Sequence, residues 1–347
     1  MPTAINFDVP KSNHKPHIEN KFYNVQAHNQ DEFLNNSSFL LEDIKREYQD
    51  LYLNDSKDNN KFEHLSSKEK GFYLDEQYVK NNINQKKSLN EISYASRAIE
   101  NAQSNDSYPT DSLSDLFNEV KQSIVAGKND YLDVLKDIFS KYMDFVKELR
   151  EILSELSQAT KAGGKDGYIN VNVDALYDKL NLLKMKLQRA SIFNLGMIFI
   201  KEDDGRFYRL INGEKVYYQN NTEVDSAVNA TEKLLSQIKG VTSKKTDNSG
   251  GIRPNIAFLL EASLDLSGID KLLDYFDKMP RGGHDILQTE FDLLKKTLDA
   301  VEKGVNTNLD ELSKKYSSAN SNYDNFVKIV SSTMNTLLEM AKGFLRF

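Results

Sequence analysis

The sequence contains no cysteine and no tryptophan in 347 residues. Without cysteine the chain has no disulfide framework, no thiolate metal site and no cysteine nucleophile. No apolar run approaches the roughly 18 residues that a membrane-spanning helix needs, so we expect no stable membrane span. The first 20 residues also lack the apolar core of a secretory signal, so we expect no cleaved signal peptide.

The chain has no large excess of charge of either sign. It carries 45 basic and 52 acidic residues and a net charge of -7. Mildly acidic chains with interspersed signs lack the basic footprint of proteins that bind nucleic acid or anionic lipid. We therefore expect no nucleic-acid partner.

Residues 1–30 are polar and hold three of the six prolines, at Pro2, Pro10 and Pro16. Such a segment buries too little apolar surface to fold by itself. It is either a plain disordered tail or an uncleaved export signal that is read while unfolded. Composition does not separate these two interpretations.

Sequence motifs for catalysis or metal binding are weak. His14 and His17 could share a metal only if the tail were helical, and we interpret them as solvated. Asp203-Asp204-Gly205 fits a hairpin turn better than a calcium loop, because Phe207 and Arg209 occupy the alternating ligand positions. Neither a serine nucleophile elbow nor a zinc-protease motif is present. We therefore predict no enzyme, no cofactor and no metal site.

The N-terminal part predicts a helical hairpin over residues 31–106. Apolar residues follow a helical stripe over 31–58, and a second helix is expected over 66–82. A third helix is expected to begin at Ser88, where Ser88 and Glu91 have the spacing of a capping box.

A long helix is predicted over residues 110–162. From Tyr131 onward its apolar residues alternate in steps of four and three, which is the seam of a coiled coil. Gly127 lies on the seam where two steps of four meet, a local departure from the repeat. Ala162-Gly163-Gly164 predicts the helix end and a turn.

A second long helix is predicted over residues 286–347, because the same alternation runs from Phe291 almost to the C-terminus. Two such narrow apolar faces are not stable alone in water, so the helices should pair. We favour antiparallel pairing, because residues 163–285 are typical of a compact domain at one end.

Residues 163–285 predict a small mixed α/β domain. Helices are expected over 173–187 and 224–238 and after a cap formed by Ser267 and Asp270. Strands are expected over 197–200, 207–211, 216–218 and 256–264, with a flexible loop over 242–251 and another leading into the last helix. The predicted fold class is thus mainly α: a long antiparallel two-helix coiled coil, an N-terminal helical hairpin and an inserted α/β domain.

Residues 312–333, LSKKYSSANSNYDNFVKIVSST, resemble the last long helix of the type III secretion needle-tip proteins, the IpaD/SipD/BipD invasin family. The ending AKGFL at 341–345 is similar to the SipD-like branch. Residues 131–167 also align with the family, although Ala159 and Ala162 stand where the family often has Trp and Pro.

This resemblance implies a secreted virulence protein at the bacterial surface that caps the needle, controls secretion and supports translocon insertion into the host membrane. The implied partners are the needle protomer, the hydrophobic translocator proteins and further copies of the chain, often taken as a pentamer. In the family the N-terminal hairpin is thought to act as an internal chaperone. Some members bind bile salts, which makes them a candidate ligand here.

The apolar end of the last helix is our predicted contact with the needle, as a helix added to a bundle. The alternative is that these side chains pack inside the chain itself. The predicted contact residues are Lys328, Met334, Leu337, Met340, Lys342, Phe344 and Phe347. Alternative functions are an α-helical pore-forming toxin and a secreted effector.

Overall fold

The computed structural model describes residues 39, 64–102, 110–189, 197–211, 214–247 and 256–345. The predicted tail 1–30 and nearly all of the predicted helix 31–58 lie outside these residues. The chain forms two compact units. The described part of the first unit comes from Phe39 and from stretches of 86–123 and 326–345, and that of the second comes from stretches of 64–85 and 124–325.

The helix α2 is a single helix of 36 residues, Ser67–Ala102. A capping box does start it, but Ser66 and Glu69 form it: Ser66 N–H donates to Glu69 Oε2 at 2.8 Å, and Glu69 N–H donates to Ser66 Oγ at 3.4 Å. The predicted break before Ser88 is therefore wrong. No Gly or Pro interrupts the sequence there, and Ser88 is 6% exposed in the middle of the helix.

The first long helix is divided into α3 (Thr110–Gly127), the π-helical turn η4 (Lys128–Leu132), α4 (Asp133–Ser154) and the short 3₁₀ turn η5 (Glu155–Ser157). In η4 the N–H of Asp133 donates to the carbonyl of Lys128, five residues earlier. The irregularity predicted at Gly127 is thus an inserted residue in the helical ladder. The helix ends at Ser157 rather than at residue 162.

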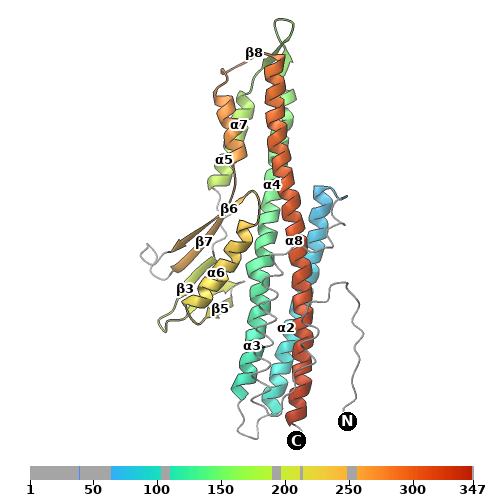
Figure 1. Ribbon diagram of the computed structural model, residues 1–347, viewed down its shortest axis with the longest axis vertical. Coiled ribbons are helices and arrows are strands. Elements are labelled where there is room, and N and C mark those ends of the chain that lie inside the picture. The colour runs from blue at the N-terminus through green and yellow to red at the C-terminus, as the bar shows by residue number, and fades with distance from the viewer. Residues whose placement is uncertain are drawn as a thin grey trace. The chain divides into compact units, whose positions relative to one another are not determined.

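The helix α8 has 58 residues, Gln288–Leu345, and pairs with α4 in antiparallel order (Figure 1). Arg150 Nη2 donates to Asn306 Oδ1 at 2.6 Å, and the rings of Phe139 and Tyr316 lie 5.7 Å apart. Further along, Tyr323 Oη donates to the carbonyl of Ile124 at 3.1 Å. Partner numbers fall along α8 as they rise along the first helix. We call α4 and the stretch of α8 beside it the helix pair, and its antiparallel order confirms the prediction.

A three-stranded antiparallel sheet, with strand order β1-β2-β8, forms around the glycine-rich loop. Its strands are β1 (Thr160–Ala162), β2 (Tyr168–Val171) and β8 (His284–Leu287). The predicted helix end at residue 162 is therefore wrong. The loop predicted over 278–284 is present over residues 278–283, but the strand β8 that follows it was not predicted. These strands have three or four residues each, too short for an alternating pattern to identify them.

A five-stranded antiparallel sheet has the order β5-β4-β3-β7-β6. The prediction identified four of its strands. It also placed a hairpin turn at Asp204-Gly205, and the positive φ of Gly205, 88°, is typical of such a turn. The predicted loop at 242–251 is wrong, because most of it is β6. The strands are β3 (Met197–Lys201), β4 (Phe207–Ile211), β5 (Glu214–Tyr218), β6 (Val241–Asp247) and β7 (Ile256–Leu264).

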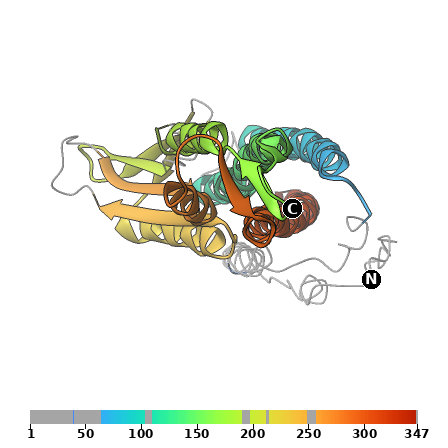
Figure 2. The same cartoon turned by 90° about the horizontal axis from the view of Figure 1, so that it is seen from above.

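Three helices complete the second unit: α5 (Asp174–Arg189), α6 (Asn221–Ser236) and α7 (Ser267–Asp277). The helix α6 packs against β5, β6 and β7, as both views show (Figure 2). The predicted cap of α7 is wrong: its N-cap residue is Leu266. The carboxylate of Asp265 accepts the N–H of Ser267 at 2.9 Å instead.

The first unit buries apolar side chains from all three of its helical stretches. Within the part of the chain that the structure describes, no helix is long and apolar enough to cross a membrane. The same residues contain no group of acidic or histidine side chains that could hold a metal ion. The buried apolar side chains of the first unit are Ile92, Ala95, Leu116, Phe117, Val120, Phe326, Val327, Val330, Met334 and Leu338.

The turn at Gly163 gives a stability prediction. A Cβ at this position would lie 2.5 Å from the carbonyl oxygen of Tyr168, a backbone atom that cannot move without shifting the β1–β2 hairpin. We expect Gly163→Ala to lower the free energy of unfolding by about 1–3 kcal/mol in urea denaturation. Gly304→Ala is the control, because nothing lies near that exposed helical position, and it should raise stability by about 0.5–1 kcal/mol. Equal stability of Gly163→Ala and the parent chain would contradict the packing described here.

Candidate functional site

The helix α2 lies on the helix pair through polar side chains. Lys70, which is 8% exposed, forms an ion pair with Asp310 of α8 at 2.7 Å. Three turns further, Asn81 is 3% exposed and its Nδ2 donates to the backbone carbonyl and to Oδ1 of Asn320, at 3.0 and 2.9 Å. We call these contacts, together with those of Tyr78 and Asn84 below, the α2 interface.

The polar contacts fix the direction of α2. Asn84 Nδ2 donates to Asp324 Oδ1 at 2.7 Å. Residue numbers on α2 and on α8 therefore rise together, so α2 runs parallel to α8 and antiparallel to α4. Hydrogen bonds between amides and carboxylates specify this register more sharply than interchangeable apolar contacts would.

Tyr78 joins α2 to the first long helix. Its hydroxyl donates to Asp133 Oδ1 at 2.7 Å and accepts from Lys128 Nζ at 3.2 Å. Lys136 Nζ lies 3.7 Å from the centre of the same ring, a cation–π contact. Burial and the hydrogen bond to Asp133 raise the pKa of Tyr78, so the phenol stays neutral and remains a donor.

The surface of α8 in the second unit includes small polar side chains that are buried. Ser313 donates to the carbonyl of Asp310 at 2.7 Å, and Asn320 Nδ2 donates to that of Tyr316 at 3.2 Å, so their own helix satisfies them. Small side chains also let neighbouring backbones approach closely. The buried polar residues of this stretch are Ser313, Ser317, Ser318, Asn320 and Asn322.

The tyrosines of the predicted seam fill it. Tyr316 and Tyr323 are 0% exposed and Tyr142 is 2% exposed. Burial is the main cause that raises the pKa of each of the three phenols. These rings are core residues of the second unit. Because protein atoms cover them, their surfaces are not accessible to a ligand in this structure.

A second polar group lies at η4, where Asp130 forms an ion pair with Arg209 of β4. The two residues are 6% and 7% exposed. Thr231 of α6 donates to the backbone carbonyl of Asp130 at 3.3 Å. We call these three residues and the neighbouring Tyr218 the Asp130 cluster. It joins the five-stranded sheet and α6 to the first long helix.

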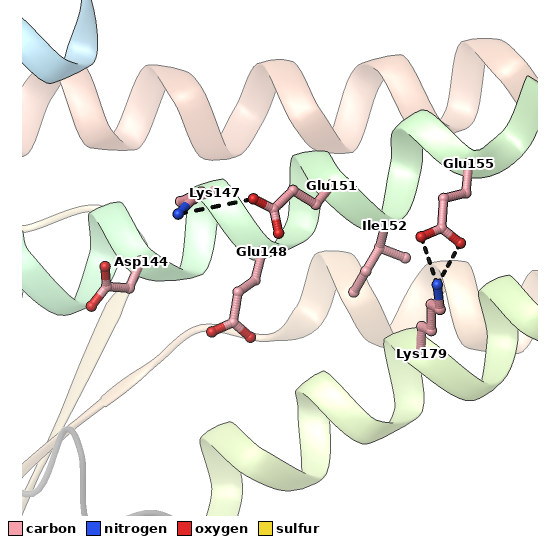
Figure 3. Close-up of a pocket in the computed structure, with 7 residues that line it drawn as sticks. All are labelled: Asp144, Lys147, Glu148, Glu151, Ile152, Glu155 and Lys179. Carbon is pink, nitrogen blue, oxygen red and sulfur yellow. Dashed lines mark hydrogen bonds and ion pairs between the residues drawn. The ribbon is translucent and has the colours of Figure 1, made fainter.

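An open groove of about 520 Å³ lies along α4 beside α5 (Figure 3). Its lining is charged and internally paired: Lys179 Nζ contacts both oxygens of Glu155 at 2.6 Å, and Lys147 lies 4.0 Å from Glu151. Ile152 is the one apolar side chain among the seven that line it. Sites for amphipathic small molecules are mostly apolar, so this groove does not suit a bile salt.

Comparison with known proteins identifies the family. The family described as type III secretion systems tip complex components matches residues 11–345 of the chain. This chain belongs to that family. As a member of this tip-complex family, the protein is a structural component and not an enzyme.

Individual relatives agree. The chain is 27% identical to the cell invasion protein SipD of Salmonella typhimurium over 69% of its own length and 64% of that protein. It is 26% identical to the invasin IpaD of Shigella flexneri over 67% of its length and 60% of that protein. The matches therefore span less than two thirds of these relatives. The solved structure of BipD of Burkholderia pseudomallei aligns at 14% identity with a TM-score of 0.43, over 89% of this chain and 99% of that one.

The predicted needle-contact residues of this tip-complex protein all belong to the end of α8 or follow it. Lys328 is exposed, and Met334 is 2% exposed within the first unit. The helix contains Leu337, Met340, Lys342 and Phe344, whose side chains lie outside the description, as does Phe347 altogether. The burial of Met334 favours internal packing for that residue, so its contact with a partner would require the first unit to open.

Sequence reasoning missed the α2 interface. A usable signal was present, because Lys70, Asn81 and Ser88 fall on the same helical face as the buried Leu74 and Ile92. Polar residues within an apolar stripe indicate a partner that satisfies them. The stripe was divided by the incorrect helix break before Ser88, which hid this pattern.

The α2 interface predicts a clear difference between two asparagines of one helix. Asn81→Ala leaves the buried Oδ1 of Asn320 without the amide that donates to it, and should cost about 1–3 kcal/mol. Asn90→Ala is the control, because Asn90 is exposed on α2 and alanine favours a helix by a few tenths of a kcal/mol. Urea denaturation followed by circular dichroism measures both. The interface would be unimportant for stability if the two variants were equally stable.

Proposed function

We propose that this protein caps the needle of a type III secretion system, where it controls secretion and supports insertion of the translocon into the host membrane. In this proposal α2 is a removable cover, part of an internal chaperone formed by residues 31–106. It protects the helix pair until the protein assembles at the tip. The polar character of the α2 interface is the observation that supports it.

A polar interface separates in water at lower cost than an apolar one. Each hydrogen bond contributes a net of only about 0.5–1.5 kcal/mol, because water replaces the partner when the groups separate. Lys70, Asn81 and Asn84 would regain water on leaving, and so would the buried serines and asparagines of α8. The exposed α8 face would then be polar enough to remain soluble and shaped to accept another helix.

The proposed partners rest on membership of the family and on the exposed Lys328 near the end of α8. We propose that residues 328–347 contact the needle protomer and that the assembled tip engages the hydrophobic translocator proteins. Self-association of several copies, as a pentamer in the simplest case, would complete the tip. Bile salts stay a candidate ligand, to which the charged groove of Figure 3 gives no support.

A disulfide can test the removable cover directly, since the chain has no cysteine of its own. Asn81→Cys with Asn320→Cys would tie α2 to α8 at a contact of 2.9 Å. We expect the oxidised protein to remain folded but to fail to assemble on purified needles, measured by co-sedimentation. The reduced protein should assemble normally.

The control ties two strands that stay paired in this proposal. Tyr168→Cys with Leu287→Cys would link β2 to β8, where these two exposed residues lie opposite each other in the ladder. Oxidation of this control should leave assembly unchanged. If oxidised Asn81→Cys/Asn320→Cys protein assembled as well as its reduced form, α2 would not need to leave.

Deletion of residues 340–347 tests the needle contact separately. We expect the shortened protein to keep its helical content and to lose most of its association with needles in the same assay. The full chain should be detected at needle tips by immunogold labelling when secretion is not triggered. Undiminished association of the shortened protein would remove this segment from the contact, and absence of the full chain from tips would contradict the capping function itself.

A further inference from the structure

The Asp130 cluster places a pair of opposite charges inside the second unit. Asp130 comes from the π-helical turn η4, and Arg209 comes from β4, in the middle of the five-stranded sheet's β5-β4-β3 half. Both side chains are more than nine-tenths buried. The contact joins two elements almost 80 positions apart in sequence. It is therefore present only while the five-stranded sheet packs against the first long helix.

The cluster is incompletely satisfied. Among the residues that the structure describes, neither Arg209 Nη1 nor the hydroxyl of Tyr218 has a hydrogen-bond partner. Tyr218 is 8% exposed, and its ring meets Phe199 edge to face at 5.0 Å, so apolar surface rather than water surrounds it. Burial raises the pKa of Tyr218 to about 12, which keeps the phenol neutral.

Charged groups from each neighbouring element affect the pair. Asp133, which is paired with Lys128 on the first helix, helps to raise the pKa of Asp130, and Glu223 of α6 helps to raise the pKa of Tyr218. Burial raises the pKa of Asp130, and Arg209 opposes this shift only in part. Desolvation of Asp130 is therefore not fully offset by its partner.

Buried ion pairs of this kind contribute little to stability as a pair. Removing the two charges from water offsets their attraction, and well-packed apolar replacements are often as stable or more stable. Unsatisfied donors weaken the contact further. The surrounding packing is apolar, since Phe199, Phe207 and Val228 are all buried. The Asp130 cluster is thus a part of the contact between the sheet and the helix in which buried polar groups lack partners.

We propose that the Asp130 cluster is a release point, at which β4 and β5 separate from the η4 turn while the sheet and the helix pair each stay folded. The separated charges would regain water, which stabilises the open form relative to an apolar contact. Such an opening would operate whatever partners the protein binds.

Hydrogen exchange of the full chain tests the release point. In the parent protein we expect amides of η4 and of β4–β5 to exchange at matching rates, about tenfold or more faster than those in the buried middle of α4. Asp130→Leu with Arg209→Met replaces the pair by apolar side chains of similar size. It should slow exchange in both segments about tenfold and leave α4 unchanged.

Two further variants make the test specific. Tyr218→Phe removes the unpartnered hydroxyl with little change in shape, and should slow the same two segments by about threefold. Glu311→Gln breaks the exposed Lys239–Glu311 pair elsewhere in the second unit and should change neither segment. If the double variant does not fold, Tyr218→Phe alone decides.

Two results would overturn the proposal. The first is exchange of η4 and β4–β5 in the parent protein only as slowly as in the middle of α4, since opening would then require global unfolding. The second is unchanged exchange in both segments of the apolar double variant, or of Tyr218→Phe where the double variant does not fold. Either outcome would leave the ion pair the role of fixing the register of the sheet on the helix.

Discussion

The antiparallel pairing of α4 with α8 is the interaction on which the second unit depends. Its seam buries Leu135, Ile138, Tyr142 and Tyr316 to 2% exposure or less, and a helix with so narrow an apolar face is not stable alone. The attachments around the pair are more polar. The helix α5 contacts α4 through Lys186 and Glu148, and the sheet contacts η4 through Arg209.

The π-helical turn explains how one helix can serve several neighbours. An inserted residue shifts the helical phase, so that side chains close in sequence point to different sides. Lys128 reaches Tyr78 of α2, whereas Asp130 reaches Arg209 of the sheet. A regular heptad would keep this region as a two-helix seam. The turn instead allows α2 and the sheet to contact the same five residues, and its position next to Gly127 was an irregularity visible in the spacing.

The sequence predicted those elements whose pattern is long or strongly periodic. Both long helices, four strands of the larger sheet and the helices α5 and α6 were identified, because many residues contribute to each signal. The strands β1, β2 and β8 were missed, since three or four residues give no alternation to detect and sheet formation depends on partners over a hundred positions away. The strand β6 was missed because its Ser, Lys and Thr residues resemble a loop, although β7 supplies its ladder.

The functional contacts were harder to predict than the fold, for a physical reason. An apolar seam must repeat along the helix, whereas a polar contact needs only one residue on each side. Asn81 and Asn320 are 239 positions apart, and neither belongs to a repeating pattern. The resemblance to tip proteins directed attention to the end of α8, where Met334 proves to be buried.

The contacts of the second unit differ in polarity, and this difference supports different roles for them in the proposed function. The contact that must persist, α4 with α8, is sealed by aromatic and aliphatic side chains that lose much on exposure to water. The contacts of α2 and of Arg209 include polar and charged groups that water can satisfy on separation, although α2 also buries Leu74. In the function proposed here, a tip component needs a rod that stays folded during assembly, together with surfaces that can be uncovered. Apolar and polar contacts placed on the same pair of helices meet both requirements, because the stability of the rod does not depend on the contacts that are released.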